Sequence, residues 1–129
     1  MTVTTSTTVK NARLDAINAT WGASAKLRLY SGTPPANAAA SLSGNTLLVE
    51  VTPSPASASG ATKDMLGGTK TNTAAAAGTA SFYRVYDSGG TTCHEQGTVG
   101  TSGTDLVIDN TTIALAATVN FNTFTKTEP

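Results

Sequence analysis

The first apolar residues of the chain recur at helical spacing. In TTVKNARLDAINATWG, one row comprises Val9, Ala12, Ala16 and Ile17, and a neighbouring row comprises Leu14, Ile17 and Trp21. Side chains three and four residues apart share one face of a helix. Thr7 or Thr8 can cap its start and Gly22 can end it. The pattern predicts one short amphipathic helix whose apolar face covers a sheet.

From residue 24 onward the period changes to two. In SAKLRLYSG, the residues Ala25, Leu27 and Leu29 alternate with Lys26, Arg28 and Tyr30, as expected for a strand with one buried and one exposed face. A loop rich in Gly and Pro follows. The segment NTLLVEV, residues 45–51, is apolar enough to predict a second strand in the middle of a sheet.

The last fifty residues carry the clearest strand pattern. TASFYRVYD and TTCHEQGTV flank the turn SGG, which predicts a β-hairpin. TDLVID and residues 110–127 add further strands, with Val119 and Phe121 expected on one face and Phe124 on the other. Short strands separated by Gly and Asn predict an all-β fold, an antiparallel β-sandwich or jelly-roll, with one short N-terminal α-helix.

A chain of 129 residues is long enough for one domain and too short for two. We expect residues 1–8 to form a flexible arm and residues 9–129 to form a single β-sandwich domain. Residues 53–77 consist mainly of Ala, Gly, Ser, Thr and Pro, which predicts a long loop anchored by Met65 and Leu66. A loop of this length usually contacts another molecule or moves.

Composition restricts the classes of partner. Charged residues make up only 12% of the chain, and eight basic residues balance eight acidic ones. No overall field attracts nucleic acid or an anionic membrane. No apolar run approaches the roughly 20 residues that cross a bilayer, and no secretory signal is evident at MTVTTSTTVK. We therefore expect a protein made in the cytoplasm, without nucleic-acid or membrane binding.

The triplet Cys93, His94 and Glu95 contains the only cysteine and the only histidine. On a regular strand, Cys93 and Glu95 would point to one face and His94 to the other. The thiol would then lie beyond reach of a histidine base, and too few ligands converge for zinc. We expect no catalytic residues, no metal site and no cofactor.

The candidate binding residues fall into three groups. The first lies on strand faces expected to be exposed and comprises Lys26, Arg28, Tyr30, Arg84 and Tyr86. At zero net charge these residues favour a protein partner over nucleic acid. The second group is Thr4 and Thr5 in the arm, and the third is Met65 and Leu66 in the long loop. Both segments are candidates for docking on a partner.

Four longer stretches carry a resemblance to a known group. KNARLDAI, KLRLYSGTPPANAAAS, GTASFYRVYDSGGTT and GTVGTSGTDLVIDNTTIALAATVNFNTFTKTEP resemble small structural proteins of tailed bacteriophages and prophages, and best match the decoration or cement proteins of the head. The resemblance implies a non-enzymatic virion protein on the capsid surface. Its implied partners are the major capsid protein and neighbouring copies of itself.

Two other functions stay open. The first is a tail component, such as a tail-tip or fibre-associated module. The second is a carbohydrate-binding module, which an exposed cluster including Trp21, Tyr30, Tyr83 and Tyr86 would favour. An aromatic share of 5% argues against the second function.

Overall fold

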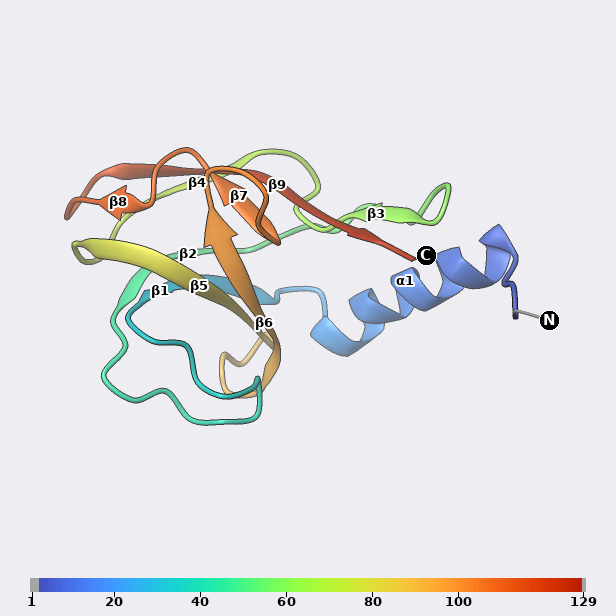
Figure 1. Ribbon diagram of the computed structural model, residues 1–129, viewed down its shortest axis with the longest axis horizontal. Coiled ribbons are helices and arrows are strands. Elements are labelled where there is room, and N and C mark those ends of the chain that lie inside the picture. The colour runs from blue at the N-terminus through green and yellow to red at the C-terminus, as the bar shows by residue number, and fades with distance from the viewer. Residues whose placement is uncertain (1–2, 129) are drawn as a thin grey trace.

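The computed structural model describes residues 3–128, and these residues form one helix and a curled, mixed β-sheet (Figure 1). The elements are α1 (Thr7–Trp21), β1 (Lys26–Ser31), β2 (Leu47–Val51), β3 (Thr62–Asp64), β4 (Lys70–Thr73), β5 (Gly78–Tyr86), β6 (Cys93–Gly100), β7 (Leu106–Ile108), β8 (Thr112–Ile113) and β9 (Thr118–Thr127). The expectation of a mostly β protein with one N-terminal helix is confirmed.

The helix begins slightly earlier than its sequence indicates. Ser6, not a threonine, is the N-cap, and its Oγ accepts a hydrogen bond from the Val9 amide at 3.3 Å. The helix therefore includes the last two residues of the predicted 1–8 arm. Residues 1 and 2 of that arm, and Pro129 of the predicted domain, lie outside the described residues. Gly22, with φ of 84°, ends the helix as predicted.

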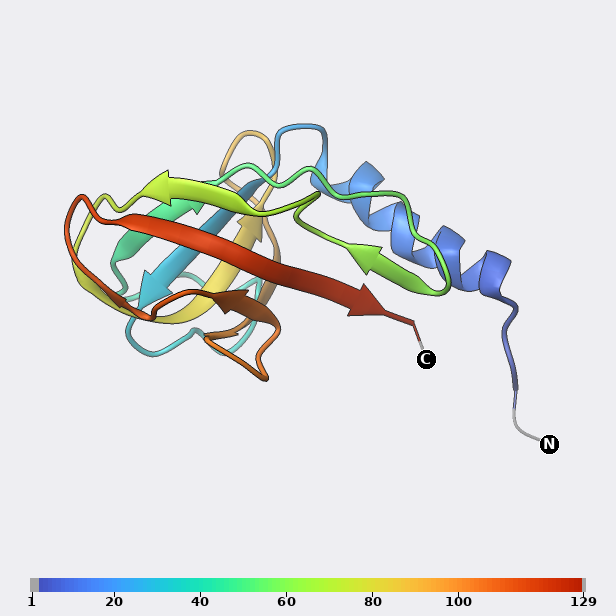
Figure 2. The ribbon, with the colours of Figure 1, turned by 90° about the horizontal axis from the view of Figure 1, so that it is seen from above.

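One of the two predicted apolar rows packs against the sheet. Leu14 and Trp21 are buried and Ile17 packs on the main core, whereas Val9 is 44% exposed. The Trp21 ring lies 6.3 Å from the Phe124 ring of β9. The helix is therefore docked through its C-terminal half, and its first turn projects beyond the sheet (Figures 1 and 2).

The sheet is mixed, which corrects the prediction of a purely antiparallel sheet and leaves the predicted sandwich or jelly-roll unconfirmed. The strand order is β2-β1-β5-β6-β7-β9-β3, with β4 also paired to β9 and β8 to β5, and β6 pairs with β7 in parallel. The Asp105 carboxylate accepts hydrogen bonds from the Thr98 amide and hydroxyl at 2.9 Å. This contact folds residues 101–105 back along β6, so that the chain enters β7 in the direction of β6.

The sheet curls until its two ends approach each other. Strand β2, predicted to be central, lies at the end of the strand order. Its outer edge is covered from the β4 side, because Leu48 O accepts from the Ala75 amide and Glu50 O accepts from the Asn72 side chain, both at 2.7 Å. The inside of the curl contains the main core, which includes Leu27, Leu29, Leu48, Tyr83, Val85, Leu106, Phe121 and Phe124.

The predicted loop at 53–77 contains two strands, β3 and β4, both paired with β9. Met65 and Leu66, predicted to anchor this segment and also named as candidates for docking on a partner, are 0% and 1% exposed, so they anchor it in the core and are not accessible to a partner. Backbone hydrogen bonds fix this segment, from Ser54 N to Leu66 O and from Met65 N to Phe124 O. Its Thr, Lys and Asn residues carry no apolar alternation, so the sequence pattern did not reveal the strands.

A bulge in β9 explains the position of Phe124. Val107 pairs with Thr123 and Ile108 pairs with Phe121, which leaves Asn122 as an extra residue in β9. One extra residue reverses the alternation of side chains along a strand. Phe121 and Phe124 therefore both face the core, and the prediction that they lie on opposite faces is wrong.

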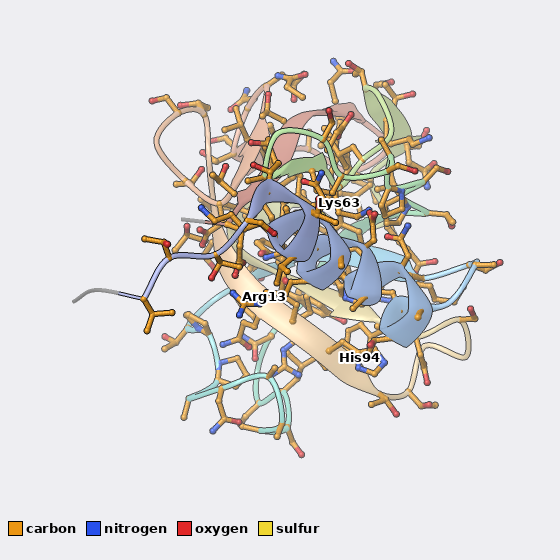
Figure 3. The ribbon with its side chains drawn as sticks, turned by 90° about the vertical axis from the view of Figure 1, so that its right-hand side faces the viewer. Arg13, Lys63 and His94 are labelled. Carbon is orange, nitrogen blue, oxygen red and sulfur yellow. The ribbon has the colours of Figure 1, made fainter. Side chains whose placement is uncertain are left out.

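An ion pair joins α1 to the β3 segment. The Lys63 ammonium, on a residue only 1% exposed, lies 2.8 Å from Asp15 Oδ1 and also donates to Ala56 O. Asp15 Oδ1 accepts a further hydrogen bond from the Ala58 amide at 2.8 Å. Figure 3 shows Lys63 beside the helix. The helix is thus attached to the sheet by charge-assisted contacts in addition to apolar packing.

We predict that Asp15→Asn lowers the unfolding temperature by several degrees at neutral pH. The hydrogen bond from Lys63, followed by that from the Ala58 amide, lowers the pKa of Asp15 in the folded protein. The stabilisation is present above the carboxyl pKa of the unfolded chain, about 4, and is lost as the pH falls through the lower folded value. Thermal unfolding of both proteins across this range should show the difference shrinking below about pH 4.

Glu128→Gln provides the control for this experiment, because Glu128 pairs with Arg13 at an exposed position. Exposed pairs contribute little to stability, so this variant should unfold close to the wild type at every pH. A difference between wild type and Asp15→Asn that stays the same from neutral to acidic pH would contradict the assigned role of the Asp15 charge.

The Tyr83 side chain lies across Gly97 of the neighbouring strand. Its hydroxyl donates to Glu95 Oε2 at 2.6 Å, and Glu95 Oε1 pairs with the Lys126 ammonium at 2.7 Å. Burial raises the pKa of Tyr83, so the phenol stays protonated and serves as a donor. A Cβ at Gly97 would lie 2.6 Å from the Tyr83 ring, which leaves no room for a side chain.

Gly97→Ala should therefore lower the free energy of unfolding by about 1–3 kcal/mol, the usual cost of overpacking a core. Gly89→Ala is the matched control, because its Cβ would meet nothing closer than 3.7 Å. Urea denaturation of the two variants measures both values. Equal stabilities for the two variants would show that the Tyr83 ring can move aside freely.

Candidate functional site

The predicted binding residues separate into three places in the structure. Thr4 is exposed and Thr5 half-buried, just before α1. Met65 and Leu66 lie in the main core. The remaining five lie on the outer face of β1 and β5, which we call the β1–β5 face, defined by Lys26, Arg28, Tyr30, Arg84 and Tyr86.

The β1–β5 face is less exposed than predicted. Tyr30, Arg84 and Tyr86 are 4%, 3% and 7% exposed, and Lys26 and Arg28 are half-buried. The expectation that all five are exposed is wrong because residues 32–46, which connect β1 to β2, fold back across this face. The cover creates a second, smaller cluster of Tyr30, Phe82 and Tyr86, with Leu42 and Cys93 packed against it.

Arg84 and Gln96 fix this covering loop in place. The Arg84 Nη2 donates to Ala40 O at 2.7 Å and to Asn37 O at 3.1 Å, and Arg84 Nε donates to Gln96 Oε1 at 2.9 Å. The Gln96 amide in turn donates to Pro35 O at 2.8 Å. Sequence reasoning identified Arg84 but missed Gln96 and the loop, because only the fold brings residues 35–40 next to them.

The other charges on this face are paired. Arg28 Nε lies 2.6 Å from Glu50 Oε2, and the Lys26 ammonium lies 3.6 Å from the other oxygen of Glu50. The Arg28 guanidinium also lies 4.7 Å from the centre of the Tyr86 ring. Burial, together with the Tyr86 hydroxyl, raises the pKa of Tyr30 to about 12. Tyr30 is therefore uncharged at neutral pH.

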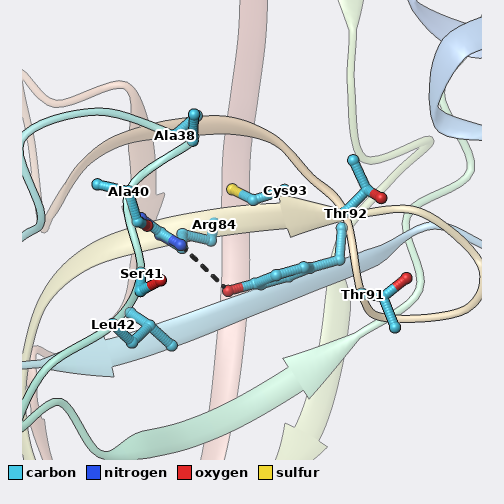
Figure 4. A pocket seen from close by; sticks show the side chains of 10 residues that line it. Ala38, Ala40, Ser41, Leu42, Arg84, Thr91, Thr92 and Cys93 are labelled. Carbon is cyan, nitrogen blue, oxygen red and sulfur yellow. Dashed lines mark hydrogen bonds between the residues drawn. The ribbon is translucent and has the colours of Figure 1, made fainter.

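A hollow of about 530 Å³ opens between the covering loop and the β5–β6 turn. Its lining consists of Ala38, Ala39, Ala40, Ser41, Leu42, Arg84, Tyr86, Thr91, Thr92 and Cys93. Figure 4 shows Arg84 meeting the hydroxyl of a tyrosine, Tyr86, inside this hollow, with Nη1 and the oxygen 3.4 Å apart. The hollow thus combines one cationic group with several hydroxyls.

The Cys93, His94 and Glu95 triplet is divided by a bulge. Val85 pairs with Glu95 and Tyr86 pairs with Cys93, so His94 is the extra residue. Cys93 lines the hollow described above, whereas His94 and Glu95 line a second one of about 260 Å³ beside α1. The separation of Cys93 from His94 is confirmed. The prediction that Cys93 and Glu95 share a face is wrong, because the bulge reverses the alternation.

The chemistry of Cys93 follows from its surroundings. Burial raises the pKa of its thiol, which therefore stays protonated at neutral pH. The Sγ donates to Glu95 O at 3.3 Å. A protonated, hydrogen-bonded thiol is a poor nucleophile, so the hollow is better suited to binding than to covalent chemistry at Cys93.

The described residues also bear on two other kinds of site, a metal site and a sugar-binding site. Among residues 3–128, no group of three His, Cys, Asp or Glu side chains is arranged to hold a metal ion. The aromatic residues that would favour sugar binding, Trp21, Tyr30, Tyr83 and Tyr86, are all buried. The described structure therefore offers no platform from these four rings for a sugar.

Over the same residues, no helix has the length and hydropathy needed to cross a bilayer. No protein-family model, no curated protein and no solved structure matches this chain.

Gln96→Ala should loosen the covering loop. The substitution leaves Pro35 O and Arg84 Nε without their partner, which should lower the free energy of unfolding by about 1–3 kcal/mol. Amide hydrogen exchange of residues 33–45 should accelerate more than that of β9. Thr79→Ala, at an exposed position on β5, should change neither quantity appreciably. Unchanged exchange in the loop of Gln96→Ala would show that Gln96 does not hold it.

Proposed function

We propose that this protein is a virion structural protein of a tailed bacteriophage, a decoration or cement protein that binds the major capsid protein on the outside of the head. The sequence resemblance supports the assignment to virion proteins. The structural observation that supports docking on another protein is the exposed segment before α1, residues 3–6. Val3 in this segment is 90% exposed.

The position of this segment suits a docking arm. It turns off the outer end of α1 and lies beyond the body of the molecule (Figures 1 and 2). Val3 and Thr4 are exposed, and Thr5 is half-buried. A short extended segment with an apolar side chain can add to the edge of a neighbour's sheet, with backbone hydrogen bonds supplying affinity.

The edge strands of this protein's own sheet also favour docking in which this protein donates the added strand. Along the outer edge of β2, backbone carbonyls accept hydrogen bonds from the Ala75 amide and the Asn72 side chain. Along the outer edge of β3, residues 54–59 make backbone hydrogen bonds, for example from Ala56 N to Asp64 O at 2.9 Å. Since both edges are covered, the protein supplies an arm to its partner more readily than it accepts a strand.

The helix that carries the arm is fixed to the sheet, which reduces the entropy lost on docking. The Asp15–Lys63 pair and the buried Leu14 and Trp21 fix α1 against the sheet. Each copy on a capsid would then make a modest contact. Contacts with neighbouring copies would add to the overall strength of binding, because linked sites raise the effective concentration of one another.

The proposal is tested by mixing the purified protein with capsids that lack it and imaging the shells. Density should return at regular positions on the head. Val3→Asp should weaken binding by about tenfold, since burying one valine contributes about 1.5 kcal/mol. Leu115→Asp is the matched control, because Leu115 is 67% exposed in the turn between β8 and β9, at the opposite end of the molecule (Figure 1).

Equal loss of binding in both variants, or none in either, would show that the arm does not dock. Binding along tails in place of heads would replace the decoration proposal by the tail-component alternative. Absence of binding to both heads and tails would overturn the virion assignment.

A further inference from the structure

Arg84 is a buried cation without a described acidic partner. Only 3% of the surface of this residue is exposed. The ion pairs within residues 3–128 involve Arg13, Lys26, Arg28, Lys63 and Lys126, but not Arg84. All of its described contacts are to neutral groups, namely Gln96 Oε1, Asn37 O, Ala40 O and the Tyr86 hydroxyl.

Neutral dipoles compensate only part of the cost of removing a cation from water. A guanidinium remains charged throughout the physiological pH range. Two of its three nitrogens, Nε and Nη2, have close partners, whereas Nη1 has only the 3.4 Å contact with Tyr86. This nitrogen is therefore the one with donor capacity left for a ligand in the hollow (Figure 4).

The acidic groups around the hollow are engaged elsewhere. Glu50 pairs with Lys26 and Arg28. The Asp87 carboxylate accepts from the amides of Thr91 and Thr92 in the turn. Glu95 faces the opposite side of the sheet, where it binds Tyr83 and Lys126. Arg84 is therefore the one charged residue that lines the hollow.

We propose that this hollow binds a carboxylate group, with Arg84 as its charged partner and the hydroxyls of Ser41, Tyr86, Thr91 or Thr92 as further donors. One guanidinium supplies one positive charge, which a single carboxylate neutralises, and its Nη1 can donate a charge-assisted hydrogen bond to a carboxylate oxygen. A phosphate dianion would be only half neutralised here. The carboxylate comes either from a small organic acid or from an acidic side chain of a protein partner, and the site is independent of the arm at residues 3–6.

The direct test is a titration of the ¹⁵N-labelled protein followed by NMR. The first titration uses glutarate, with glutaramide as its neutral counterpart. The second titration uses a short, acetylated and amidated peptide with a single Glu, compared with the same peptide in which Gln replaces this Glu. We expect saturable shifts at residues 38–42 and 91–93 with an acid, and at least tenfold weaker binding of its neutral counterpart.

Two sets of variants examine the role of Arg84. Arg84→Gln should reduce acid binding at least tenfold, whereas Arg13→Gln, on the helix, should leave it unchanged. Ser41→Glu places a carboxylate of the chain itself in the hollow, so it should compete with the added acid and abolish its binding. Ser41→Gln, of similar size and without charge, should reduce binding much less. The Ser41 variants remain informative even if Arg84→Gln does not fold.

The outcomes separate the sources of the carboxylate. Binding of glutarate alone supports a small acid, and tighter binding of the Glu peptide supports an acidic protein segment. Absence of shifts with both acids would overturn the proposal. Equal binding of acids and neutral counterparts, equal loss in Ser41→Glu and Ser41→Gln, or tighter binding of inorganic phosphate than of glutarate would overturn it too.

Discussion

Strand β9 is the element on which the rest of the sheet depends. It pairs with β7 along one edge and with both β3 and β4 along the other. Strands β3 and β4 consist mainly of Thr, Lys and Asn, so they bury little apolar surface and gain their order from backbone pairing with β9. The bulge at Asn122 then turns Phe121 and Phe124 to the same side, where both fill the core.

Strand β5 is covered on both faces. Tyr83 and Val85 face the main core, and Phe82 and Tyr86 face the cluster under the covering loop. Because this double burial leaves few large apolar side chains at the surface, the features open to partners are limited. Val3, Val9, Leu47 and Leu115 are the exposed large hydrophobic residues of the described chain.

The proposed arm and the proposed carboxylate site are physically different and lie in different parts of the fold. The arm offers backbone groups and one apolar side chain at the end of α1, where the partner must supply a sheet edge. The hollow offers a buried charge, which requires an oppositely charged group of limited size. In the proposed function, the arm would serve for attachment and the hollow for selecting what the protein contacts.

The sequence by itself determined the local elements whose apolar residues follow a clear period. These are the helix with Leu14, Ile17 and Trp21, strand β1, and the hairpin of β5 and β6. Only the tertiary structure decided which residues are exposed and which share a face. Bulges at His94 and Asn122 reverse the alternation without changing the composition, and the loop over Arg84 and Tyr86 buries residues that a lone strand would expose. Such effects arise from pairing and coverage between segments distant in the chain, which a local period cannot encode.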